Sequence, residues 1–521
     1  MTLTRTEPPR LAEVVAAFAL AIDLANGIPA EHGLRCTLIA ERLGALLGLP
    51  EDDRADLYHV TLLRFLGCTA DSHEVAQLMG DEIRLSSQFE QMDPGNPNDA
   101  LASALHHLGE GQPLPRRAWM FITMLSYGSK RADFVLGHCE AAQRLGARLG
   151  VSRRVVDLLD DVYERWDGKG EPRHRPGPDL APVIRVIHLA KDVEIHHRYY
   201  GVDGAVAVAR KRSGSTLDPD LVELFCKHAE DVVEAVEVTS AWEAVLAAEP
   251  GLHRRMAPEH LEGAAEALAD FADLKSAFLA GHSRRVARLS ASALATLGTP
   301  QSQIATMRLA GLVHDLGRVA VSALVWDRSG PLTDAEWERI RLHPYNTERL
   351  LHRTVALRDA GGLAGLHHER LDGAGYHRGI GPAGLSLDAR ILAAADAYAA
   401  LTEERAHRPA RTTDAAAKVL RADVHSGRLD RTACEAVLEA AGHRRQAREW
   451  PAALSDREVQ VLRLMTRGLS LKQMAEALNV TVKTVDTHVQ HIYDKIQVRS
   501  RAGAAVFAME HELTGPDQDF S

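Results

Sequence analysis

The feature that most constrains the fold is a set of histidines and aspartates between positions 282 and 396. His314 and Asp315 are adjacent and follow an apolar helix predicted from Ala305 to Val313. Such a pair can present an imidazole and a bridging carboxylate to two metal ions. The other ligand-type residues stand in separate segments: His282, His343, His367, His368 and Asp396. Segments far apart in the chain must therefore converge on one point, which favours helices packed around a metal site.

The residue types predict how two ions would be shared. Asp315 is predicted to bridge them. The other ligands divide into one coordination sphere of His282, His314 and Asp396 and a second of His343 with His367 or His368. Mixed imidazole and carboxylate ligands suit two divalent ions, iron or manganese, with zinc as an alternative. Two such ions activate a shared water and hold phosphoryl oxygens, so the set predicts a phosphohydrolase.

Substrate phosphates also need cations near the metals. Arg318 lies one helical turn after Asp315, and Arg405 and Arg408 follow Asp396. A guanidinium fork matches phosphate oxygens, so these three arginines are the predicted phosphate contacts. Asp315 and Arg318 are the predicted catalytic residues.

Length and composition predict an all-α protein of three domains. The chain has 521 residues, 45% hydrophobic but only 5% aromatic, which suits helices packed through Ala and Leu. We expect two helical domains at 1–250 and 251–445, the first of them a degenerate copy of the second, and a small helix-turn-helix domain at 450–515. The net charge of -10 means that any contact with nucleic acid must be local.

Cysteine usage and hydropathy predict a cytoplasmic protein. The five cysteines are scattered and form no C-x-x-C pair, which argues for a reducing compartment and against a cysteine zinc site. No apolar run approaches the roughly 18 residues of a membrane span. The nearest, Leu11 to Leu24, contains Glu13 and Asp23 and is predicted to be a buried first helix.

Residues 1–250 form a degenerate repeat of the metal region. Alignment on a shared Glu-Arg-x-Asp-Gly pairs Glu164 with Glu369 and places Arg64 where His314 stands. An arginine there opposes metal binding, so we predict a sensor, dimerisation or scaffold domain. A mononuclear site of His32, His138 and Asp192 is an alternative. A helix is predicted over Val151–Trp166 and another over Pro182–Tyr200.

Residues 274 to about 440 resemble the HD-GYP domain, the cyclic-di-GMP phosphodiesterase branch of the HD superfamily. The resemblance rests on Gly281-His, His314-Asp-Leu-Gly-Arg, Gly330-Pro-Leu-Thr, His343-Pro, His367-His-Glu-Arg-Leu-Asp-Gly-Ala-Gly-Tyr-His, Ala389-Arg-Ile-Leu-Ala-Ala-Ala-Asp and Ala400-Leu-Thr-Glu-Glu-Arg-Ala-His-Arg-Pro. It implies a helical fold, a di-iron or dimanganese centre, and hydrolysis of cyclic-di-GMP to pGpG or GMP.

Three positions depart from the family pattern. Arg318 stands where the family usually has Lys, which keeps the charge but changes a point ammonium into a planar fork. His377 replaces the proline of Gly-Tyr-Pro. Phe278 stands where some members have a glutamate that supports a third metal, so two metals are predicted.

The C-terminal stretch has the spacing of a helix-turn-helix. Leu454–Met465 is amphipathic, with Ser455 and Glu458 in capping-box spacing, and it is followed by short helices at Leu471–Leu478 and Val482–Ile496. A three-helix docking module is the alternative that the pattern alone leaves open.

This stretch, about residues 450–512, resembles a LuxR-type DNA-binding domain through Leu454-Ser-Asp-Arg-Glu, Lys472-Gln-Met-Ala-Glu and Thr484-Val-Asp-Thr-His. The resemblance implies that Val482–Ile496 enters the major groove of double-stranded DNA and that Ala502–Leu513 pairs two copies in a homodimer. The predicted DNA-binding residues are Lys483, Thr484, Thr487, His488, Gln490, Lys495, Arg499 and Arg501.

Together these features predict a cytoplasmic bacterial transcription regulator that carries a metal-dependent phosphodiesterase and does not bind a membrane. One alternative is a regulator that senses a cyclic dinucleotide without turning it over. Another is a phosphohydrolase that acts on a different phosphoester.

Overall fold

The computed structural model describes residues 8–93, 96–109, 113–127, 131–443, 450–511 and 513. Over these ranges the chain consists of helices, turns and a few isolated bridges, without a strand, so the predicted all-α class is confirmed. The chain divides into two compact units, residues 1–443 and 444–521. No helix of the described ranges is both long and apolar enough to cross a membrane.

The first unit contains both predicted copies, whose mutual boundary at residue 250 stays a prediction. The helices of the first copy (residues 1–250) are α1 (Leu11–Ala25), α2 (His32–Leu46), α3 (Glu51–Leu63), α4 (Ser72–Met79), α5 (Glu82–Gln88), α6 (Pro97–His107), α7 (Leu114–Tyr127), α8 (Arg131–Leu149), α9 (Arg153–Leu158), α10 (Pro182–Arg212), α11 (Pro219–Lys227), α12 (Ala229–Glu234) and α13 (Ala241–Ala247).

The second copy begins at residue 251. Its helices are α14 (Pro258–Asp273), α15 (His282–Thr296), α16 (Gln301–Val313), the 3₁₀ helix η3 (Leu316–Ala320), α17 (Ala323–Trp326), α18 (Asp334–Arg341), α19 (His343–Leu351), α20 (Arg358–Ala364), α21 (Leu387–Thr402), α22 (Thr413–His425) and α23 (Arg431–Ala440). The second unit contains α24 (Asp456–Thr466), α25 (Leu471–Ala477), α26 (Val482–Ile496) and α27 (Arg501–Glu510).

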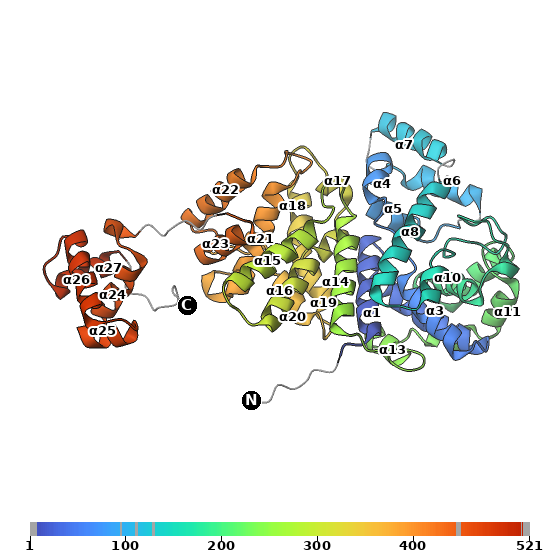
Figure 1. The fold of residues 1–521 in the computed structure, drawn as a ribbon. Helices are drawn as coiled ribbons and strands as arrows, with labels where there is room; N and C mark the ends of the chain where they lie inside the picture. The colour runs from blue at the N-terminus through green and yellow to red at the C-terminus, as the bar shows by residue number, and fades with distance from the viewer. Residues whose placement is uncertain are drawn as a thin grey trace. The chain divides into compact units, whose positions relative to one another are not determined.

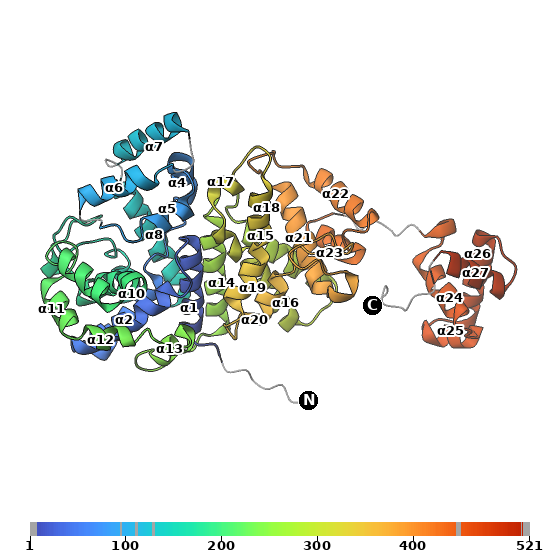
Figure 2. The same cartoon turned by 180° about the vertical axis from the view of Figure 1, so that it is seen from behind.

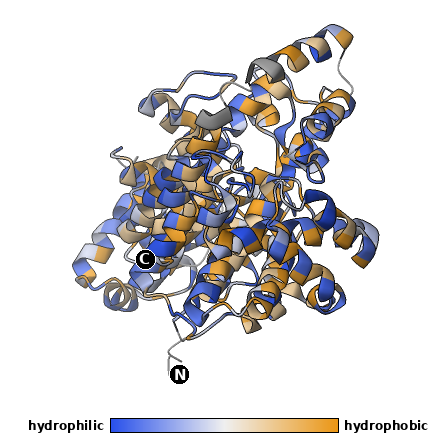
Figure 3. Cartoon of the chain, turned by 90° about the vertical axis from the view of Figure 1, so that its right-hand side faces the viewer, coloured by the Kyte–Doolittle hydropathy of each residue, from blue (hydrophilic) through white to orange (hydrophobic). Residues whose placement is uncertain are grey.

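The two copies share one core in the first unit. Helices α1 and α14 lie side by side between them in both views (Figures 1 and 2). Phe18 and Phe271 pack edge to face there, with ring centroids 5.3 Å apart. The predicted first helix is therefore buried, as expected. Most helices carry both hydrophilic and hydrophobic residues (Figure 3), which matches their packing on a core.

Equivalent contacts recur in the two copies. The Glu164 carboxylate accepts hydrogen bonds from backbone N–H groups nine and eleven residues further on, at 2.7 and 3.0 Å. Glu369 accepts the same two bonds at 2.8 and 2.9 Å. Likewise, Asp23 and Asp273 each accept a bond from the N–H ten residues later. The alignment of the copies therefore corresponds to shared local structure.

Local predictions had mixed outcomes. The predicted capping box at Ser455 is formed, and another is present at Thr333. The helix predicted over Val151–Trp166 is wrong, because only Arg153–Leu158 is helical and the chain then turns. The reason is that the Glu164 carboxylate accepts two backbone hydrogen bonds from the following loop. These bonds hold the segment in a turn, although its apolar residues have helical spacing. Helix α10 extends past the predicted Tyr200 to Arg212, with a kink at Gly201.

Candidate metal centre

The ends of several helices carry the predicted ligands to one buried point. His282 is the first residue of α15, and His343 is the first residue of α19. His314 and Asp315 join α16 to η3. The pair His367-His368 lies in the turn after α20, and Asp396 lies within α21. All seven side chains are buried except that of His368, which is half-buried.

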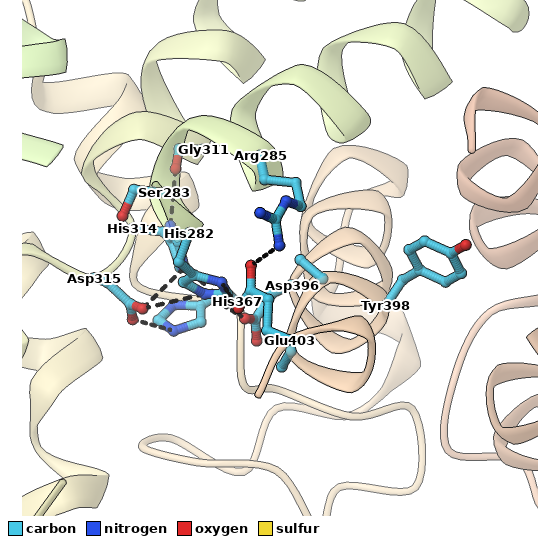
Figure 4. Close-up of polar contacts among 12 residues, drawn as sticks. His282, Ser283, Arg285, Gly311, His314, Asp315, His367, Asp396, Tyr398 and Glu403 are labelled. Atoms are coloured by element: carbon cyan, nitrogen blue, oxygen red, sulfur yellow. Dashed lines mark hydrogen bonds and ion pairs between the residues drawn. The ribbon is translucent and has the colours of Figure 1, made fainter. Parts of the chain in front are cut away.

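Asp315 lies against four imidazoles of this cluster, and Figure 4 shows its contacts with neighbouring histidines. Its Oδ2 is 3.5 Å from His282 Nε2 and 3.2 Å from His314 Nε2. Its Oδ1 is 3.3 Å from His343 Nε2 and 3.4 Å from His367 Nε2. One carboxylate therefore faces two imidazoles with each oxygen, which is the geometry of a group that bridges two cations.

Asp396 closes the cluster from α21. Its Oδ1 lies 3.3 Å from His282 Nε2, and its Oδ2 lies 3.8 Å from His368 Nδ1. Two three-residue groups are compact enough to hold an ion each: His282, His314 and Asp315, and His343, His367 and His368. The structure thus brings all seven predicted ligands together, while their role as metal ligands stays a prediction.

Backbone carbonyls orient three of the imidazoles. Nδ1 of His314, His343 and His367 donates to the carbonyl three residues earlier, at 2.8, 2.6 and 2.7 Å. Each Nδ1 therefore carries the proton, and each Nε2 turns its lone pair toward Asp315. Such a partner on the far nitrogen is how proteins fix a metal-binding histidine.

Glu403 orients the fourth imidazole, and sequence reasoning missed it. Its Oε2 lies 2.8 Å from His282 Nδ1. Arg285 and Arg405 hold the same carboxylate at 2.6 and 2.8 Å. Burial alone would lower the pKa of His282, but Asp396 and Glu403 raise it to about 9. Glu403 lies within Ala400–Pro409, one of the stretches that carry the family resemblance. A carboxylate can orient a metal-binding histidine, and this chemistry was the signal that the sequence offered.

Unsatisfied polar atoms test whether the residues fit a metal. Nε2 of His282, Nε2 of His314 and both carboxylate oxygens of Asp315 are buried and make no well-formed hydrogen bond within the described residues. Buried polar atoms without partners are costly, and these converge on one point. A nitrogen and oxygen donor set of this kind fits divalent cations.

The protonation states of Asp315, Asp396 and His343 also fit. Burial would favour a neutral Asp315, but Arg318 and His314 hold the pKa of this carboxyl well below its usual range. Burial likewise opposes the ionisation of Asp396, yet neighbouring imidazoles keep its pKa well below normal. Burial lowers the pKa of His343 to about 4. Ionised carboxylates and a neutral imidazole are the forms that bind metal.

The three predicted phosphate-binding arginines differ in position. Arg318 Nε lies 2.7 Å from Asp315 Oδ2, and its guanidinium lies 4.5 Å over the Trp326 ring. Arg405 instead donates a hydrogen bond to the Glu403 carboxylate. Arg408 donates to backbone carbonyls of residues 400, 401, 403 and 409. These contacts show that Arg408 holds the conformation of its own loop. Of the three arginines, Arg318 is the best placed to contact a substrate phosphate.

In the first copy, built-in cations occupy the equivalent region. Arg64 donates to His188 Nδ1 at 3.1 Å. Asp192 pairs with Arg212 at 2.8 Å and with Lys191 at 3.6 Å. Because side-chain cations neutralise Asp192, this copy does not need the metal pair that is predicted for the second.

The alternative mononuclear site of His32, His138 and Asp192 is wrong. His138 pairs with Asp71 at 2.8 Å and contacts Tyr163, whereas Asp192 has the arginine and lysine partners given above. Among the described residues, the compact ligand group that contains His32 has other members. The alignment placed these positions correctly but could not show that each side chain has a local partner.

The second unit presents the predicted DNA-binding face. Helix α26 packs on the domain core through Val485, Val489, Ile492 and Ile496. The opposite side exposes Lys483, Thr484, Thr487 and Gln490, with His488 half-buried and Arg499 exposed beyond the helix.

Two of the predicted DNA contacts, although exposed, have partners within their own domain. Lys495 Nζ lies 2.7 Å from Glu458 Oε2, and Arg501 donates to the carbonyls of Met465 and Leu469. The pairing helix predicted at Ala502–Leu513 corresponds to α27, and the predicted domain end at 515 lies outside the described residues.

Comparison with protein families agrees with the two resemblances seen in the sequence, one in the metal region and one in the C-terminal stretch. The HD domain family matches residues 266–433, and the family described as bacterial regulatory proteins, luxR family, matches residues 452–508. The chain joins an HD domain to a luxR-family domain. The HD domain thus contains every predicted metal ligand, and the luxR-family domain contains every predicted DNA contact.

Relatives of known name match different lengths of the chain. The 3'3'-cGAMP-specific phosphodiesterase 3 of Vibrio cholerae is 28% identical over 425 residues, which cover 80% of this chain and 91% of that protein. A cyclic di-GMP phosphodiesterase of Pseudomonas aeruginosa is 33% identical over 165 residues, 31% of this chain and 39% of that protein. The response regulator VraR of Staphylococcus aureus is 40% identical over 60 residues, 12% of this chain and 29% of that protein.

One solved structure resembles both copies. It is the cyclic GMP-AMP specific phosphodiesterase V-cGAP3 of Vibrio cholerae, with a TM-score of 0.57 and 24% identity, covering 84% of this chain and 98% of that one. At this identity the likeness establishes the fold of helices on which the candidate centre is built.

Proposed function

We propose that this protein hydrolyses a cyclic dinucleotide at the Asp315 centre and that this reaction controls DNA binding by the luxR-family domain. The observation that carries the proposal is the position of Asp315, whose two oxygens each face two imidazole nitrogens at 3.2–3.5 Å. The buried atoms without hydrogen bonds at the same point support two divalent cations, iron or manganese.

The chain's own residues would bind and orient a phosphodiester. The seven ligand side chains would hold two ions, which supply an activated water and charge neutralisation when bound. Burial would lower the pKa of Arg318, but Asp315 and Asp396 raise it, so the guanidinium stays charged. The Trp326 ring under it fixes its plane, and the guanidinium can donate to phosphate oxygens. Burial also raises the pKa of Tyr376, so its phenol keeps a proton to donate.

Two substrates are candidates. The HD-GYP resemblance predicts cyclic-di-GMP. The relative that aligns over 80% of this chain is named for 3'3'-cGAMP, which makes that dinucleotide an equal candidate. Both present phosphodiesters to the centre, and they differ in one base.

DNA binding is the second half of the proposal. Exposed Lys483, Thr487 and Gln490 on α26 would reach phosphates and base edges in the major groove. A homodimer paired through α27 would read two half-sites. Because DNA is the target, we place the protein in the cytoplasm.

The alternative function is a sensor that binds the dinucleotide without turnover. Arg318 in place of the family's lysine, and His377 in place of its proline, are the residues that favour it. The intact ligand cluster favours the enzyme.

The deciding experiment measures hydrolysis of both dinucleotides by anaerobically purified protein with Fe²⁺ or Mn²⁺. Turnover by the wild type and none by Asp315→Ala would support the enzyme. Tight nucleotide binding and nucleotide-dependent DNA binding, without turnover under any metal, would support the sensor instead. Turnover of neither dinucleotide but of another phosphoester would replace the proposed substrate class.

A further inference from the structure

The first copy contains a second group of ligand-type side chains, next to its own cation-filled region. His32 and Cys36 lie on α2, and Glu194 lies on α10. One ligand atom from each lies within 4.8 Å of the others, and all three residues are buried. His32 Nδ1 is 2.5 Å from Glu194 Oε2, and Cys36 Sγ is 3.5 Å from His32 Nε2.

We propose that His32, Cys36 and Glu194 bind a single transition-metal ion of the zinc type. Residues four apart on a helix lie on one face, so α2 presents its imidazole and its thiol together, and α10 adds the carboxylate. A nitrogen, sulfur and oxygen donor set of this size suits Zn²⁺ in tetrahedral coordination. Scattered cysteines had predicted no cysteine zinc site, but spacing between cysteines cannot reveal a site that uses only one.

The second copy shows what these positions hold when no such site is present. By the offset that pairs His32 with His282, Cys36 corresponds to Val286. By the offset that pairs Asp192 with Asp396, Glu194 corresponds to Tyr398. Both counterparts are core residues. The first copy therefore has a thiol and a carboxylate at two positions that the fold can fill with hydrophobic side chains. Burying such groups is costly unless they are paired. Glu194 is paired with His32 and Arg198, whereas Cys36 contacts only His32 at 3.5 Å among the side-chain contacts described.

The surroundings leave room for a fourth ligand. A small cavity of about 20 Å³ is lined by Asp23, His32 and Cys36, together with Arg64 and Lys191. This space is enough for one water molecule. The Asp23 carboxylate lines the same cavity and could bind the ion or hold its water.

Charge limits the site to one ion. Arg64 and Lys191 line the cavity, and Arg198 contacts Glu194 at 3.2 Å. These cations oppose a second divalent ion. On binding, the Cys36 thiol and the protonated His32 imidazole would each lose one proton to solvent, and the thiolate would form one sulfur–metal bond. No electron is transferred in this step.

Cobalt(II) gives a test that is independent of the proposed phosphodiesterase. A thiolate bound to Co²⁺ produces a charge-transfer band in the near ultraviolet, and the seven predicted ligands of the second copy include no cysteine. The full-length chain loaded with Co²⁺ should show this band. The variant Cys36→Val, which inserts the residue that the second copy uses, should lose the band and one metal ion per chain. Glu194→Gln, which keeps the shape of the side chain, should weaken Co²⁺ binding at this site.

Two control variants separate the sites. Cys226→Ala, at a half-buried thiol on α11, should leave the band unchanged. Asp315→Ala should keep the band while losing ions from the second copy. The proposal is overturned if wild-type protein shows no band, or if folded Cys36→Val retains the band and the same metal count.

Discussion

Glu403 Oε2 lies 2.8 Å from His282 Nδ1, on the side of the imidazole that faces away from Asp315. Arg285 and Arg405 hold this carboxylate from two directions. The other three central imidazoles use the backbone carbonyl three residues earlier for the same purpose. His282 is oriented instead by a side chain about 120 residues away in sequence.

This relationship predicts that Glu403 is a positioning residue. Glu403→Gln keeps the shape but removes the charge, so the amide no longer fixes His282 with its Nε2 turned inward. We expect the affinity for Mn²⁺ to fall by about 10–100-fold, as for other partners of metal-binding histidines. Metal titration of the purified chain measures it.

The matched control is Glu404→Gln, one residue further along and exposed. It should leave the affinity unchanged. Equal Mn²⁺ affinities for Glu403→Gln and the wild type would show that the contact does not position the ligand.

How far the sequence could predict the centre depends on how local each signal is. His314-Asp315 and His367-His368 can be recognised in the sequence as motifs, because the ligand-type residues of each pair are adjacent. Glu403 does not, because its role exists only once α15 and the end of α21 meet. The helix wrongly predicted over Val151–Trp166 fails for a related reason: apolar spacing cannot show that Glu164 accepts two backbone N–H groups from the loop beyond it.

Metal should stabilise the first unit. The buried Nε2 atoms and the Asp315 oxygens are unsatisfied, and an ion that binds only the folded chain adds to its free energy of unfolding. At about 100 times the dissociation constant the gain is about 2.7 kcal/mol. Thermal unfolding with and without Mn²⁺ after chelation measures it. Asp315→Asn should lose most of the gain, whereas Asp414→Asn, at an 88% exposed side chain, should keep it.

Arg318 is predicted to bind substrate phosphate. Its removal should raise KM by about 10–100-fold, the range expected for losing a charged hydrogen bond. Arg318→Lys should fall between Arg318→Ala and the wild type, because it keeps the charge but loses the fork and the Trp326 contact. Steady-state kinetics on the hydrolysed dinucleotide measures both. Arg341→Ala, exposed on α18, is the control, and an unchanged KM for Arg318→Ala would remove Arg318 from the substrate site.

The luxR-family domain shows the same contrast between what a sequence motif predicts and which partners its side chains contact. The resemblance to a LuxR-type domain pointed to Lys483 and Thr487 on α26, and both are exposed. It could not distinguish them from Lys495 and Arg501, which have similar charges but bind Glu458 and backbone carbonyls within the domain. A positive charge in a motif is thus a candidate contact until its own neighbours are known.

This contrast predicts two kinds of variant in the luxR-family domain. Lys483→Ala should weaken binding to all DNA sequences and lower the slope of log affinity against log salt by about one, because one phosphate contact is lost. Arg501→Ala should instead lower the melting temperature of the domain, because it leaves the Met465 and Leu469 carbonyls without their donor.

Fluorescence anisotropy at several salt concentrations, beside thermal unfolding, separates the two effects. Lys418→Ala, exposed on α22 of the first unit, is the matched control and should change neither quantity. If Lys483→Ala binds with wild-type affinity and salt slope, α26 does not meet the phosphate backbone at that residue. If Arg501→Ala weakens DNA binding without any loss of stability, the guanidinium reaches DNA, and its contacts to the two carbonyls do not hold the domain together.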